Sequence, residues 1–243
     1  MIFGSNKNKK DKQDQQQQNK RLVGLAAASA LEKLPLEDMV LGIGTGSTVD
    51  LLIQNLPDNV KKRLHKPVAV SSQASMKMLD EYRIAYEKDT NLINGIDLYL
   101  DGADEVDEYG RMIKGGGGAL TGEKILAAQA RDFWCLVDNS KLVQLLGDFP
   151  VAVEMTAMAR SLVSREILKL GGNPEYRMGF ISDHGNPIVD VYGLDLTEPH
   201  KMEERLNNLP GVLANGIFAA NRATKIFCGG GDAKEEVQVI LPK

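Results

Sequence analysis

The order of short apolar runs and intervening segments constrains the fold of this chain more than any other feature. Val40–Ile43 leads into the turn GTGST and then into a helical segment from about Thr48 to Leu56. Ile96–Leu100 leads in the same way into the turn Asp101-Gly102-Ala103-Asp104. Strands that alternate with helices predict a parallel sheet with helices on both faces, the Rossmann-like α/β class. Ligands of such sheets bind outside the carboxyl ends of the strands, where both turns fall.

Other segments fit the same order. A helix is expected where apolar residues recur at helical spacing and a proline ends the pattern, and strands are expected where short β-branched or aromatic runs occur. The expected helices are Arg21–Leu34, Ser72–Glu81 and Ala119–Ala130, and the expected strands are Val68–Val70 and Phe133–Val137.

The pattern changes near Pro150, where a β-α-β-β-α-β order begins. This order is typical of a ferredoxin-like α+β unit. Its expected elements are Val151–Glu154, Ala157–Leu170, a hairpin of Tyr176–Ser182 with Pro187–Tyr192, Glu198–Leu209 and Val212–Phe218. The sequence therefore predicts a small inserted domain at 147–218 and a catalytic α/β domain at 20–146 plus 219–243. The apolar runs 225–228 and 237–240 are expected to return to the main sheet of the catalytic domain.

The N-terminal segment is strongly polar. Residues 4–19 contain no apolar side chain and cannot contribute to a core. We expect residues 1–19 to form a disordered polar arm, and we weigh against this the alternative that a basic, glutamine-rich arm touches an anionic partner.

Composition narrows the functional class. The chain of 243 residues has 43% apolar and 26% charged residues and a net charge of −4, which gives no general reason to expect nucleic-acid binding. Cys135 and Cys228 lie far apart without a metal-binding spacing, so we expect neither a disulfide framework nor a metal site. No apolar run suits a membrane span or a signal peptide, and a cytoplasmic location is expected.

The glycine-rich turn after Val40–Ile43 suits an anion. Glycines let successive N–H groups turn toward one point, the following helix N-terminus adds a partial positive charge, and hydroxyl donors are available. The turn lacks the lysine of a Walker A loop and the third spacing of a dinucleotide fingerprint. A plain tight turn with a hydroxyl N-cap is the alternative, but we favour anion binding by Thr45, Gly46, Ser47 and Thr48.

A second motif pairs carboxyl groups with a lysine and a glycine run. Asp101 and Asp104 flank Gly102-Ala103 at the end of an apolar strand, and Lys114 precedes four consecutive glycines. An Asx-turn with solvated acids is the alternative for the aspartates, and a flexible linker is the alternative for the glycines. The position at the ligand edge of the sheet favours a site in which backbone and ligand approach closely.

Glu123 stands in the first turn of the helix that follows the glycines. An acid at a helix N-terminus can simply stabilise the helix. The three histidines, His65, His184 and His200, lie outside these motifs, so acid–base chemistry falls to carboxyl groups. This elimination favours Glu123 as a base.

Taken together, these segments resemble the A-type ribose-5-phosphate isomerase family. The matching motifs, in chain order, are GIGTGST, SSQAS, DGADEVD, KGGGGALTGEK, DNSK, FPVAVEM, GGNPEYR and ANR. The resemblance covers nearly the whole chain from Lys20 onward. Gly118 departs from it, since many members carry Ala there.

The resemblance implies a function and a set of roles. The family interconverts ribose 5-phosphate and ribulose 5-phosphate without a cofactor, usually as a homodimer. Glu123 matches the family's catalytic base, and Asp101, Asp104 and Lys114 match its active-site polar groups. Positions that match substrate contacts are Lys20, Thr45, Gly46, Ser47, Thr48, Gly102, Ala103, Gly115, Gly116, Gly117 and Lys141.

Two other functional classes stay open at this point. A coenzyme A transferase would use Glu123 as a nucleophile, although the chain is short for a complete enzyme of that kind. A sugar-phosphate-binding regulatory domain would need a DNA-reading helix-turn-helix, which residues 1–19 cannot form.

Overall fold

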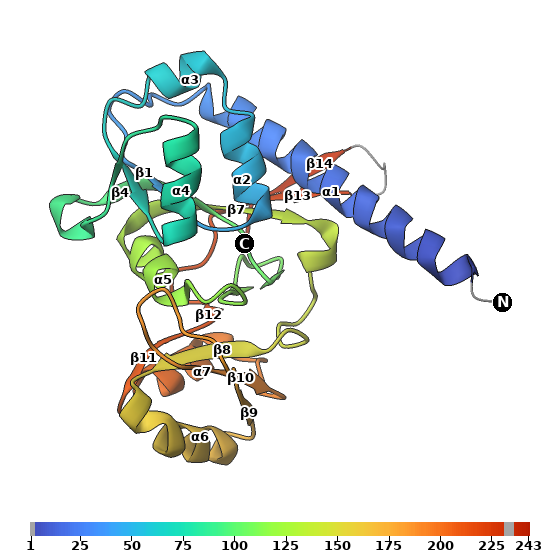
Figure 1. Cartoon of the computed structure of the whole chain (residues 1–243), viewed down its shortest axis with the longest axis vertical. Coiled ribbons are helices and arrows are strands. Elements are labelled where there is room, and N and C mark those ends of the chain that lie inside the picture. Colours follow the sequence, from blue (N-terminus) through green and yellow to red (C-terminus); the bar gives the residue numbers. More distant parts are fainter. Residues whose placement is uncertain (1–2, 231–235) are drawn as a thin grey trace.

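The computed structural model describes residues 3–230 and 236–243, with side chains from residue 12 onward. Figure 1 shows a larger unit built on one sheet and a smaller unit, containing β8 to β11, beneath it. Helix α5 lies between the main sheet and the smaller unit. This position makes α5 the element through which the two units meet.

The elements have the following bounds. The α-helices are α1 (Phe3–Leu31), α2 (Ser47–Gln54), α3 (Asp58–Lys62), α4 (Gln73–Glu81), α5 (Leu120–Gln129), α6 (Arg160–Lys169) and α7 (Pro199–Asn207). The strands are β1 (Leu41–Ile43), β2 (Val68–Val70), β3 (Tyr86–Glu87), β4 (Ile96–Asp101), β5 (Glu105–Val106), β6 (Met112–Ile113), β7 (Ala130–Asp138), β8 (Val151–Met155), β9 (Asn173–Tyr176), β10 (Ile188–Tyr192), β11 (Val212–Asn215), β12 (Ile217–Phe218), β13 (Lys225–Gly229) and β14 (Val237–Ile240). Short 3-10 turns are η1 (Thr90–Leu92), η2 (Asn139–Lys141) and η3 (Ala157–Ala159).

The main sheet confirms the expected α/β class. Within the described residues its strand order is β14-β13-β7-β4-β1-β2-β3, and all neighbours are parallel except β13 and β14. Apolar residues of α1, α2 and α4 cover one face, and α5 covers the other. Because parallel strands end at one edge, the turns after β1 and β4 lie side by side, as expected.

The small unit confirms the ferredoxin-like expectation. Its antiparallel sheet has the order β11-β8-β10-β9, and its core packs against α6 and α7. Alternation along β8 places Val151, Val153 and Met155 in that core. Ala152 and Glu154 therefore point to the opposite face, where Ala152 packs against Leu120 of α5.

Some local expectations differ from the structure. The expected strand Val212–Phe218 is two strands, because Gly216 turns the chain so that β11 pairs with β8 and β12 pairs with β6. A Cβ at Gly216 would lie 2.3 Å from the Lys114 carbonyl oxygen. The first hairpin strand is β9, earlier than Tyr176–Ser182, and the short strands β5 and β6 carry no pattern long enough to predict. The domain boundaries at 147 and 218 stay a prediction.

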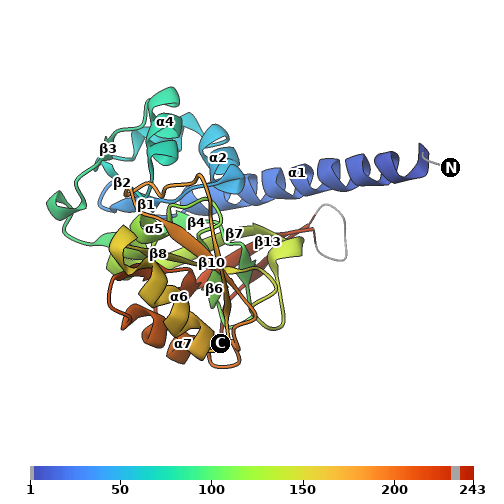
Figure 2. The same cartoon turned by 60° about the horizontal axis from the view of Figure 1, so that its bottom comes forward.

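The expected disordered arm is wrong for residues 3–19, which belong to α1, while residues 1 and 2 lie outside the described range. Figure 2 shows the N-terminal half of α1 projecting from the molecule. Glutamine and lysine are good helix formers, and a helix already held by its packed C-terminal half extends at little cost. Val23 and Ala27 are fully buried in that half, and Asn19 is buried as well. Among the described residues, no helix is long and apolar enough to cross a membrane.

Candidate active site

The predicted site residues come together at the carboxyl edge of the main sheet. They line a cleft with a volume of about 250 Å³. Asp101 is the exception, since it is completely buried beneath the cleft. The predicted residues that line it are Lys20, Thr45, Gly46, Ser47, Thr48, Gly102, Ala103, Asp104, Lys114, Gly115, Gly116, Gly117, Glu123 and Lys141.

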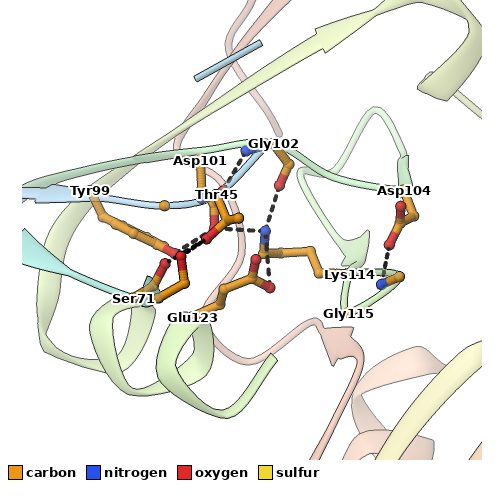
Figure 3. Close-up of polar contacts among 12 residues, drawn as sticks. Thr45, Ser71, Tyr99, Asp101, Gly102, Asp104, Lys114, Gly115 and Glu123 are labelled. Atoms are coloured by element: carbon orange, nitrogen blue, oxygen red, sulfur yellow. Dashed lines mark hydrogen bonds and ion pairs between the residues drawn. The ribbon is translucent and has the colours of Figure 1, made fainter. Parts of the chain in front are cut away.

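Lys114 occupies the centre of the polar cluster in Figure 3. Its Nζ lies 2.7 Å from Asp101 Oδ2 and 3.4 Å from Glu123 Oε2, and it donates to the Gly102 carbonyl oxygen at 2.6 Å. Burial would lower the pKa of Lys114, but the Asp101 and Glu123 carboxyl groups outweigh it and raise that pKa above its ordinary value. Lys114 is therefore a fixed cation beneath any ligand in the cleft.

Glu123 carries the most perturbed carboxyl group of the cleft. The pKa of Glu123 is raised to about 8, because burial and the negative charges of Asp101 and Asp104 together outweigh the opposing effect of Lys114. Among the described residues, Glu123 Oε2 is the buried side-chain oxygen that lacks a hydrogen-bond partner. A carboxyl group that keeps one oxygen without a hydrogen bond, within ion-pair distance of Lys114, and has a pKa near neutrality suits proton transfer.

Asp101 is held by donors on every side. Its Oδ1 accepts hydrogen bonds from Thr45 N at 2.9 Å and Gly102 N at 2.7 Å, and its Oδ2 accepts one from the Tyr99 hydroxyl. Gly44 makes room for this arrangement, because a Cβ there would lie 1.9 Å from Asp101 Cγ. Asp101 is thus tied to both β1 and β4.

The glycine run lines the cleft beside Asp104. Gly116 N donates to Asp104 Oδ2 at 2.9 Å, and a Cβ on Gly116 would meet the Asp104 oxygens at 3.0 Å. Gly118 has a φ of 85°, and the Phe180 ring fills the space that a Cβ there would need. The run is therefore an ordered loop in contact with its neighbours, and the linker alternative does not describe it.

Two lysines line the part of the cleft that is formed by the first turn of α2. Lys20 Nζ on α1 donates to Ser47 Oγ at 3.0 Å, at the start of α2. Lys141 belongs to η2, directly after β7. Both lysines line the cleft with the first turn of α2, whose N-terminal N–H groups have no side-chain cap. Positive charge and free N–H groups together suit an anion.

Several residues that support the site were not predicted from the sequence. Tyr99 is fully buried next to Asp101, which together with burial raises the pKa of Tyr99 well above its ordinary value. Tyr99 lies two residues before Asp101 on the same strand, and this spacing puts both side chains on one face of the sheet, which was the signal available in the sequence. Thr45 Oγ1 meets a group of hydroxyls at 2.6 to 3.2 Å, those of Ser71, Ser72 and Ser75. Asp138 also lines the cleft and accepts a hydrogen bond from Gln16 of α1.

The donor set contains no arrangement typical of a metal centre. Within residues 3–230 and 236–243, no group of three or more His, Cys, Asp or Glu side chains is placed to hold a metal ion. Asp101 and Glu123 pair with Lys114, and Asp104 accepts a hydrogen bond from Gly116 N.

Comparison with known proteins identifies the family. Residues 68–233 match the family model of ribose 5-phosphate isomerase A (phosphoriboisomerase A). A curated ribose-5-phosphate isomerase A from Legionella pneumophila is 50% identical over 203 residues, which cover 84% of this chain and 93% of that protein. The chain belongs to the ribose 5-phosphate isomerase A family.

Solved structures agree with the assignment. The ribose 5-phosphate isomerase A of Neisseria gonorrhoeae is 42% identical with a TM-score of 0.85, covering 93% of this chain and 98% of that one. The Methanocaldococcus jannaschii enzyme is 34% identical with a TM-score of 0.79, covering 92% and 99%. The chain is therefore an isomerase that acts on ribose 5-phosphate. The transferase and regulatory-domain alternatives are not favoured.

Proposed function

We propose that the cleft interconverts D-ribose 5-phosphate and D-ribulose 5-phosphate with Glu123 as the base. An aldose–ketose isomerisation moves one proton between C1 and C2 through an enediolate. In the forward direction Glu123 removes the C2 proton of the open-chain sugar and returns it to C1. The Oε2 atom without a hydrogen bond and the pKa of about 8 support this role, because a base must hold the proton and then release it.

The neighbouring groups supply charge where the enediolate forms. Lys114 is a buried cation 3.4 Å from Glu123 Oε2, so negative charge developing on the sugar oxygens beside Glu123 is stabilised. Asp104 also lines the cleft and takes part in moving the hydroxyl protons of O1 and O2. Asp101 assists opening of the sugar ring through its contact with Lys114.

The phosphate group is proposed to bind at the Lys20 and Lys141 part of the cleft. Two ammonium groups, the Ser47 hydroxyl and the uncapped first turn of α2 can together meet a dianion. This places the phosphate and the reacting carbons in different parts of one cleft. The turn GTGST then binds the phosphate group, which is the role expected for an anion-binding turn.

Replacement of Glu123 tests the assignment. Glu123→Gln removes the base and keeps the size of the side chain, so kcat should fall by about a hundredfold or more while KM changes little. The measurement is turnover of ribose 5-phosphate in metal-free buffer with EDTA, which also tests the expectation that no cofactor is needed.

A matched variant controls for the loss of a carboxyl group. Glu108→Gln alters an exposed side chain outside the cleft, paired with Lys243, and should leave kcat unchanged. Circular dichroism of all three proteins checks the fold. If Glu123→Gln kept more than about a tenth of the wild-type kcat, Glu123 would not be the base.

We further propose that the protein is a cytoplasmic homodimer. Both cysteines are buried free thiols, which suits a reducing compartment. Sedimentation equilibrium should give twice the mass of one chain. A mass of one chain at micromolar concentration would contradict the dimer.

A further inference from the structure

Glu154 is a fully buried carboxyl residue outside the cleft. It lies on β8 of the small unit, on the face that points away from α6 and α7. Burying a carboxyl group is costly unless donors meet its oxygens. Its contacts therefore show what this residue does.

Three side chains donate to Glu154, and they come from both units. Thr121 Oγ1 of α5 donates to Glu154 Oε2 at 2.6 Å. Ser182 Oγ and Asn186 Nδ2, which lie between β9 and β10, donate to Glu154 Oε1 at 2.6 and 3.0 Å. The carboxyl group thus joins the first turn of α5 to the small unit.

The first turn of α5 also carries Glu123, two residues after Thr121. Nearby contacts with the small unit confine the same turn. Leu120 packs against Ala152, and Lys124 Nζ pairs with Glu203 Oε1 at 2.5 Å. Of these contacts, the hydrogen bond of Thr121 is the one that links α5 to the buried carboxyl group on β8.

We propose that Glu154 is a positioning residue that acts through Thr121 to hold the Glu123 carboxyl group beside Lys114. The inference rests on the proposed role of Glu123 as the base. A displacement of about 1 Å at a reacting group can cost about a hundredfold in rate. A smaller relaxation of the first turn of α5 should therefore cost about tenfold.

Variants at Thr121 test the link. Thr121→Val keeps the shape and removes the donor, and kcat for ribose 5-phosphate should fall about tenfold with KM nearly unchanged. Thr121→Ser keeps the hydroxyl and should restore most of kcat. If the Glu123 carboxyl group moves away from Lys114, it loses the positive charge that lowers its pKa. The acid limb of kcat/KM should therefore also move to higher pH in Thr121→Val.

Two further variants separate positioning from other effects. Asn186→Ala removes a donor to the same carboxyl group from the small unit and leaves α5 alone, so kcat should stay near wild type. Glu154→Leu removes the acceptor of the Thr121 hydroxyl, so kcat should fall about as much as in Thr121→Val. Thermal unfolding of each variant compares the loss of stability.

The outcomes decide the proposal. A wild-type kcat and pH profile in Thr121→Val would overturn it, as would an equal loss of kcat in Asn186→Ala. Thr121→Ala replaces Thr121→Val if the valine variant does not fold, with the same expected results. Activity retained by Glu123→Gln would instead overturn the role of the base, so the two failures are distinguishable.

Discussion

At the scale of single residues, the chemistry depends on the ionisation of Glu123. Burial and neighbouring charges raise its pKa to about 8, and a base works only when deprotonated, so kcat/KM should rise with pH along a limb centred near pH 8. Asp101 contributes negative charge to that rise, and Asp101→Asn should therefore move the limb to lower pH even if it lowers the rate. The measurement is kcat/KM across a pH series, with Asp97→Asn, at the other end of β4, as the control. An unmoved limb in Asp101→Asn would contradict this coupling.

At the scale of elements, α1 brings a cation to the cleft from a part of the chain with no other site residue. Lys20→Met should raise KM for ribose 5-phosphate about tenfold to a hundredfold, as expected for the loss of one charge-assisted contact, with a smaller change in kcat. Arg21→Met removes the same charge from an exposed position off the cleft and should change KM little. Unphosphorylated ribose supplies the decisive comparison. An equal effect of Lys20→Met on ribose and on ribose 5-phosphate would place the phosphate elsewhere.

At the scale of the whole molecule, the two units share buried contacts and should unfold together. Lys124 of α5 pairs with Glu203 of α7, which also accepts hydrogen bonds from two backbone N–H groups near β12. Trp134 is the single tryptophan and lies in the main sheet, so its fluorescence reports that unit, whereas far-ultraviolet circular dichroism reports both. The two signals should give one coincident denaturant transition. A dichroism change that precedes the fluorescence change would show that the small unit unfolds alone.

Local patterns were sufficient to predict the sheet edge and the residues on it. Apolar strands, glycines and a helix start occur in short segments whose conformation depends mostly on neighbours in sequence. Asp101, Lys114 and Glu123 were therefore predicted, and the structure brings them within ion-pair distance. The bounds of β9 and the break at Gly216 were not predictable, because they depend on which distant strand each segment pairs with.

The amino-acid sequence by itself determined the α/β class, the ferredoxin-like unit and most of the polar residues that line the cleft. Only the tertiary structure decided that residues 3–19 continue α1, that Tyr99 donates to Asp101, and that Glu154 reaches Thr121. The physical reason is the range of the interactions. Periodicity and turn chemistry act over a few residues, whereas the burial of a polar group is settled by donors that arrive from elsewhere in the chain. The pKa of about 8 at Glu123 belongs to the second kind, because burial and the charges of Asp101, Asp104 and Lys114 produce it together.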